Sequence, residues 1–192
     1  MRLLSFLLSG VLLYTAVLLL TSLFAQPPYH WVGATAAAVF LPLWYLLSAV
    51  NARKGIASGY GLGLELAVFT AAFGGPAALA LSTWWISTTR WEGGPVITTG
   101  RTPVILAAGI AMWTATVLLT GLLSPTAPAV TATAFFLPLW LLVAVANGLV
   151  GVIAAGYTPA EEAPVLLVNF SVPAAAAASW VAPWRAARRS RT

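Results

Sequence analysis

Six apolar stretches, each of about 20 residues, decide what this 192-residue chain can fold into. They lie at 3–24, 32–52, 64–86, 103–123, 129–152 and 164–182. A helix of this length crosses roughly 30 Å of hydrocarbon, and a spanning segment must satisfy its own backbone polar groups because lipid supplies no water. The segments between the stretches are rich in Pro, Gly, Ser and Thr, which is typical of turns. The sequence therefore predicts an all-α polytopic membrane protein with six transmembrane helices and no soluble domain.

Charged residues are too rare in this sequence for a water-soluble fold. They make up 7% of the chain, against roughly 25% in soluble domains. The net charge of +5 comes from scattered basic residues and a C-terminal group, so we expect no RNA or DNA partner. The expected partner is the lipid bilayer. Its anionic headgroups are predicted to contact the basic tail through Arg185, Arg188, Arg189 and Arg191.

The chain contains an internal duplication. Residues 40–44 and 136–140 both read Phe-Leu-Pro-Leu-Trp, and Asn51 recurs at the same offset as Asn147. With one inserted residue the match continues through the next span, and the first span aligns with the fourth through pairs such as Gly10 and Gly109. The first span therefore belongs to the repeat, and we interpret it as a helix of the fold rather than as a secretory signal. The duplication predicts a three-helix repeat at 1–95, a second at 96–184 and a basic tail at 185–192.

An odd number of spans in each repeat has a consequence for topology. If all six helices cross the bilayer, the second repeat enters from the opposite side, so the repeats are predicted to be inverted. With the N-terminus inside, seven of the nine basic residues lie in the cytoplasm, and Arg90 and Arg101 lie outside. Cytoplasmic loops are enriched in Lys and Arg, so both termini are predicted to be cytoplasmic. Arg101, which aligns with Arg2, is an exception to this charge pattern.

Three polar residues recur in both repeats and are the candidate lining of a polar path. They are Asn51, Tyr60 and Glu65 in the first repeat, and Asn147, Tyr157 and Glu162 in the second. An amide, a hydroxyl and a carboxylate at neighbouring helix ends can line a vestibule, and transporters with inverted repeats place their sites at the repeat interface. A structural interpretation is also open. In that interpretation Asn caps a helix, Gly-Tyr forms the turn, and Glu lies at the favourable N-terminus of the next helix.

Four prolines fall inside the predicted spans and are expected to kink their helices: Pro42, Pro76, Pro138 and Pro173. Each removes the hydrogen bond to the carbonyl four residues earlier, and at membrane depth that carbonyl needs another partner. The prolines therefore mark either a hinge or central cavity, or simple helix curvature. Trp44 and Trp140 follow the duplicated prolines and either fill the space that a kink opens or face lipid.

Catalysis is not expected from this composition. The chain has no Cys, no Asp and a single His, and we find no nucleophile–base pair, metal-ligand cluster or phosphate-binding glycine loop in the sequence, so no cofactor or metal is expected. Few ionisable residues lie inside the spans, which argues against an ion-coupled pump.

Two functions remain open. The first is a small permease or channel-like protein for a neutral or weakly polar solute, and the second is a noncatalytic accessory or scaffold subunit of a membrane complex. A cavity lined by Asn51, Glu65, Asn147 and Glu162 would favour the permease, whereas a solid bundle would favour the scaffold. Small-residue runs such as 174–178 suit close helix packing within the chain, with a homodimer as the alternative.

Overall fold

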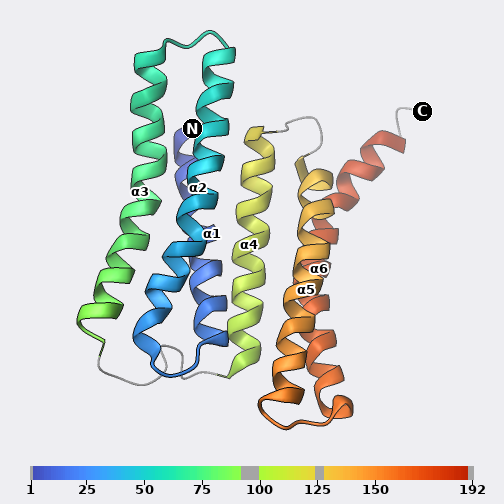
Figure 1. Cartoon of the computed structure of the whole chain (residues 1–192). Coiled ribbons are helices and arrows are strands. Elements are labelled where there is room, and N and C mark those ends of the chain that lie inside the picture. Colours follow the sequence, from blue (N-terminus) through green and yellow to red (C-terminus); the bar gives the residue numbers. More distant parts are fainter. Residues whose placement is uncertain (1, 92–99, 124–127, 190–192) are drawn as a thin grey trace. The chain divides into compact units, whose positions relative to one another are not determined.

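A computed structural model describes residues 2–91, 100–123 and 128–189, with side chains described as far as Val181. The elements, in chain order, are α1 (Arg2–Phe24), the short 3-10 helix η1 (Tyr29–Trp31), α2 (Val32–Ala57), α3 (Leu62–Thr89), α4 (Arg101–Leu123), α5 (Pro128–Ile153) and α6 (Pro159–Arg189). Each of the six α-helices is long and apolar enough to cross a membrane. The predicted six-helix, all-α architecture is confirmed over these residues (Figure 1). The tail arginine side chains predicted to meet lipid headgroups lie outside the described part.

The chain divides into two compact units, unit 1 (Met1–Thr99) and unit 2 (Gly100–Thr192). In unit 1, α2 and α3 form an antiparallel hairpin and α1 packs against both (Figure 1). In unit 2, α5 and α6 form the hairpin and α4 packs against both. Each unit is thus an up-down-up bundle. The N-terminus of its first helix, the C-terminal part of its second and the N-terminus of its third lie at one end.

Helix α6 begins before the apolar stretch that predicted it, because a capping box sets its start. The backbone N–H and the hydroxyl of Thr158 donate to Glu161 Oε2 at 2.9 and 2.8 Å, and the backbone N–H of Glu161 donates to Thr158 Oγ1 at 3.4 Å. Pro159 occupies the first helical position, where its missing N–H costs no hydrogen bond. The sixth span was predicted to start at 164, since hydropathy marks where a helix becomes apolar and not where its hydrogen bonding begins.

Helix α2 ends in the glycine turn that the sequence indicates. Gly59 has a φ of +91°, and Tyr60 donates its backbone N–H to the carbonyl of Gly55 at 3.2 Å. This is the hydrogen-bond pattern of a Schellman motif, which requires a left-handed residue and therefore favours glycine. In unit 2, Gly156 has a φ of +75° at the matching turn. The duplicated Gly-Tyr pair therefore reverses the chain in both units.

Two buried tryptophans donate hydrogen bonds to backbone carbonyls that have no helical N–H donor because a proline lies four residues later. Trp44 Nε1 donates to the carbonyl of Ala72 at 3.1 Å. Ala72 lies four residues before Pro76, so the proline cannot donate to that carbonyl within the helix. In unit 2, Trp140 Nε1 donates in the same way to the carbonyl of Asn169 at 3.0 Å, four residues before Pro173. Each indole therefore provides the replacement partner that a proline at membrane depth requires.

A glycine on the first helix of each unit makes room for this tryptophan and proline. A Cβ on Gly10 would lie 2.5 Å from Trp44 Cζ2 and 2.6 Å from Pro76 Cγ. A Cβ on Gly109 would lie 2.5 Å from the indole and 2.7 Å from the proline ring of unit 2. Trp44 is fully buried, as is Trp140, so the lipid-facing alternative for these two residues was wrong. We call each set the Trp-Pro-Gly lock: Trp44, Pro76 and Gly10 in unit 1, and Trp140, Pro173 and Gly109 in unit 2.

Candidate functional site

Each unit has a polar cluster at the end where its three helices begin or finish together. In unit 1, the Arg2 guanidinium donates to the carbonyl oxygen and to Oδ1 of Asn51 at 3.1 and 2.9 Å. In unit 2, the Arg101 guanidinium donates to the same two atoms of Asn147 at 2.6 and 2.8 Å. Both asparagines lie inside their helices, so they do not cap them. Each instead links the second helix of its unit to the first.

A glutamate from the third helix completes each cluster. Glu65 and Glu162 are buried, with 5% and 6% of their surface exposed. A Cβ added to Gly55 would overlap the Glu65 carboxyl group, and one added to Gly151 would overlap that of Glu162. These glycines lie one helical turn after the asparagines, so the carboxyl groups occupy the space that their missing side chains leave.

We call the two sets the unit 1 cluster and the unit 2 cluster. The unit 1 cluster is Arg2, Asn51, Gly55 and Glu65, and the unit 2 cluster is Arg101, Asn147, Gly151 and Glu162. The arginines and glycines were absent from the predicted path, although both pairs align in the duplication. The sequence did not indicate the role of the arginines, because Arg101 was interpreted only as a charge in a loop. It did not indicate the role of the glycines, because that role depends on which atoms of the folded chain lie where a Cβ would be.

The other predicted residues lie apart from the clusters or at their edge. Tyr60 and Tyr157 are each 51% exposed at the interhelical turns. Pro42 and Pro138 lie inside α2 and α5 with exposed side chains. Pro76 and Pro173 are fully buried in the Trp-Pro-Gly locks. The four prolines therefore divide into an exposed pair and a packed pair.

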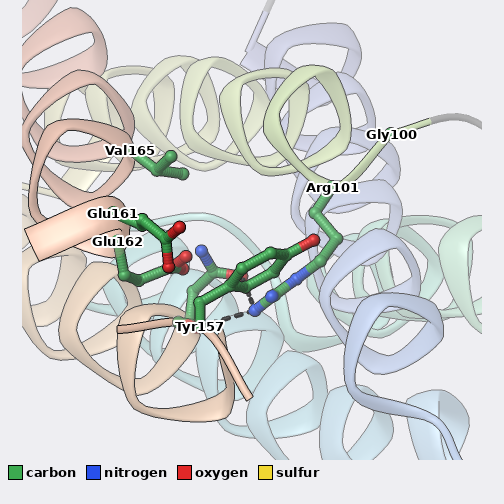
Figure 2. Close-up of a pocket in the computed structure, with 7 residues that line it drawn as sticks. Gly100, Arg101, Tyr157, Glu161, Glu162 and Val165 are labelled. Atoms are coloured by element: carbon green, nitrogen blue, oxygen red, sulfur yellow. Dashed lines mark hydrogen bonds between the residues drawn. The ribbon is translucent and has the colours of Figure 1, made fainter. Parts of the chain in front are cut away.

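The unit 2 cluster borders a pocket of about 470 Å³. Its lining comprises Gly100, Arg101, Asn147, Tyr157, Glu161, Glu162 and Val165. Figure 2 shows the side chains of Arg101 and Tyr157 and both carboxyl groups around this one opening. The volume falls in the range of small-molecule sites. All three path residues predicted in the second repeat therefore border a single pocket.

Two of the lining residues each have a buried side-chain atom with no hydrogen-bond partner within the described residues. These atoms are Asn147 Nδ2 and Glu162 Oε1. An arginine carries donors only, so Asn147 must present Oδ1 to Arg101, and its Nδ2 remains as a donor. We call Asn147 Nδ2 the free donor and Glu162 Oε1 the free acceptor. Both atoms belong to residues that line the pocket.

The helices and clusters define an all-helical protein of the multi-pass membrane class. No protein-family model, curated protein or solved structure matches the chain. Over the residues that the structure describes, no group of three or more His, Cys, Asp or Glu side chains is placed to hold a metal ion.

Proposed function

We propose that the protein is a small permease for a neutral or weakly polar solute, and that the solute binds in the unit 2 pocket. The observation that carries this proposal is the pair of buried atoms, the free donor and the free acceptor, on two residues that line the pocket. A buried polar atom without a partner is unfavourable, and in native proteins such atoms usually meet a ligand or water. The same pocket is also lined by the guanidinium of Arg101 and the carboxyl group of Glu161.

The proposal includes an inverted arrangement of the two repeats, with both termini in the cytoplasm. It is supported by the contacts that the units share, since each has the same arginine–asparagine bonds and the same Trp-Pro-Gly lock. Three spanning helices per unit then place the unit 1 cluster toward the cytoplasm and the unit 2 cluster toward the opposite side. In this proposal the solute is bound by the second-repeat residues Asn147, Tyr157 and Glu162, whereas Asn51, Tyr60 and Glu65 of the first repeat hold their own helices together and do not contact the solute.

Single cysteines at the two matched interhelical turns test this arrangement. The chain has no native cysteine, and Ser58 and Ala155 are equivalent, exposed positions between α2 and α3 and between α5 and α6. Ser58→Cys is expected to react with a membrane-impermeant maleimide only after permeabilisation, whereas Ala155→Cys should react in intact cells. Labelling of both positions from the same side would refute the inversion.

Flux into proteoliposomes tests the permease itself. Vesicles that contain the purified protein are expected to swell faster in an isotonic gradient of urea, acetamide or glycerol than vesicles without protein, measured by stopped-flow light scattering. The physical reason is that a polar pocket lowers the cost of removing such a solute from water. Swelling at the protein-free rate for all three solutes would overturn the proposal.

A scaffold subunit is the second candidate, and an exposed aromatic group in unit 1 favours it. Tyr45 is 52% exposed and meets Phe69 and Phe73 edge to face, with ring centroids 5.8 and 5.7 Å apart. Aromatic side chains on an outer helix face can pack against a partner helix as well as against lipid. A scaffold is expected to give no flux, and to hold a stoichiometric partner when purified in mild detergent.

A further inference from the structure

We infer that the solute of the unit 2 pocket carries a carboxamide or urea group. Its carbonyl oxygen accepts a hydrogen bond from Asn147 Nδ2, and its N–H donates one to Glu162 Oε1. This inference rests on the proposed function, because it names the chemical class of the solute that the same pocket binds.

Some polar atoms of the lining have partners inside the protein. Arg101 Nη2 donates to the two oxygens of Asn147, and Glu161 Oε2 accepts from Thr158 in the capping box. The free donor and the free acceptor are different, because both are buried and neither is met by another described group. In this inference a bound solute meets an amide nitrogen with two unmet N–H groups and one unmet carboxyl oxygen.

These two atoms come from different helices, α5 and α6, and in the described structure they do not hydrogen-bond each other. A molecule that bridges them must offer an acceptor to one and a donor to the other. A carboxamide or urea group carries these on separate atoms, so it bridges a wider gap than a single hydroxyl oxygen. Asn147 is itself anchored by Arg101, which holds the free donor in a fixed direction.

Charged solutes fit these groups less well. An ammonium group has no acceptor, so it would leave Asn147 Nδ2 unmet. A carboxylate has no donor and would face the Glu162 carboxyl group. A neutral amide offers a partner to both atoms.

The test measures acetamide binding to the full chain in lipid nanodiscs by saturation-transfer difference NMR. Acetamide is expected to bind with a dissociation constant of about a millimolar, as befits so small a ligand, and urea should compete. N,N-dimethylacetamide keeps the carbonyl and lacks the N–H, so it should bind about tenfold more weakly or worse. Equal binding of the two amides, or stronger competition by glycerol than by urea, would overturn the inference.

Matched variants place the binding in unit 2. Asn147→Asp keeps an acceptor for Arg101 and replaces the free donor with an oxygen, and Glu162→Met removes the free acceptor while nearly keeping its volume. Each is expected to weaken acetamide binding about tenfold or more. The equivalent changes in unit 1, Asn51→Asp and Glu65→Met, should leave binding unchanged. Equal losses of binding for the unit 1 and unit 2 variants would refute the assignment of the solute to the unit 2 pocket. The comparison of acetamide with N,N-dimethylacetamide uses the wild-type protein, so it does not depend on whether any variant folds.

The inference and the proposed function fail in different ways. Glycerol flux without acetamide binding would retain the permease and refute the amide class. Acetamide binding without flux of any solute would retain the site and refute the permease.

Discussion

Replacing Gly10 or Gly109 with alanine is expected to lower the free energy of unfolding by about 1–3 kcal/mol, and leucine at either position is expected to prevent stable folding. The added Cβ would lie 2.5 Å from an indole carbon of Trp44 or Trp140. Tryptophan and proline rings are rigid and lie between packed helices, so neither can yield by a simple side-chain rotation. The measurement is an SDS titration of protein in mixed micelles, followed by tryptophan fluorescence.

Gly74 provides the matched control for this prediction. It lies inside α3, and within the described structure a Cβ there would meet no neighbouring atom closer than 4 Å. Gly74→Ala should therefore keep the unfolding free energy or raise it by about 0.5–1 kcal/mol, as expected for the removal of glycine from a helix. If Gly10→Ala were as well tolerated as Gly74→Ala, the Trp-Pro-Gly lock would not stabilise the fold as described.

Replacing Trp140 with phenylalanine is expected to cost about 1–3 kcal/mol for the unmet carbonyl of Asn169, in addition to lost packing. The indole N–H donates to that carbonyl because Pro173 cannot. Pro173→Ala restores a backbone N–H that can donate to the same carbonyl within α6. Trp140→Phe should consequently cost less in the Pro173→Ala background than in the wild-type background.

A double-mutant cycle over these two positions measures the expected coupling. The unfolding free energies of wild type, both single variants and the double variant should give a coupling of about 0.5–3 kcal/mol, with the double variant more stable than the sum of the single losses predicts. The cycle corrects for the lost contact between Pro173 and Gly109, since that loss occurs in both backgrounds. Strictly additive losses would show that the indole does not replace the helical donor.

The sequence predicts the six helices well because each apolar stretch is long enough to leave only one structure possible in lipid. It is less informative about helix ends, which depend on hydrogen bonding at the boundary. Helix α6 begins among polar residues, at the Thr158–Glu161 capping box. Helix α2 continues beyond Arg53 and Lys54 and ends only at the Schellman turn formed by Gly59. Neither boundary is visible in hydropathy.

The candidate site is only partly predictable from the sequence, because the duplication identifies recurring residues but not the contacts between them. The duplication singles out Asn147, Tyr157 and Glu162, which do border one pocket. The duplication also repeats the arginine and the glycine of each cluster. In the distribution of basic residues across the membrane, however, Arg101 stands out only as an exception, although it bonds Asn147. A glycine inside a helix does not indicate from sequence alone that a carboxyl group packs against it. What the sequence could not supply is the three-dimensional contact that leaves Asn147 Nδ2 as a donor.

The most direct test of the account compares acetamide flux for two matched variants in proteoliposomes, Asn147→Asp and Asn51→Asp. Both asparagines are buried, and both accept two hydrogen bonds from an arginine of the first helix in their unit. Asn147→Asp is expected to lower the flux about tenfold or more, while Asn51→Asp is expected to stay close to wild type. Equal flux for the two variants, whether both are lowered or both unchanged, would contradict a solute site in unit 2.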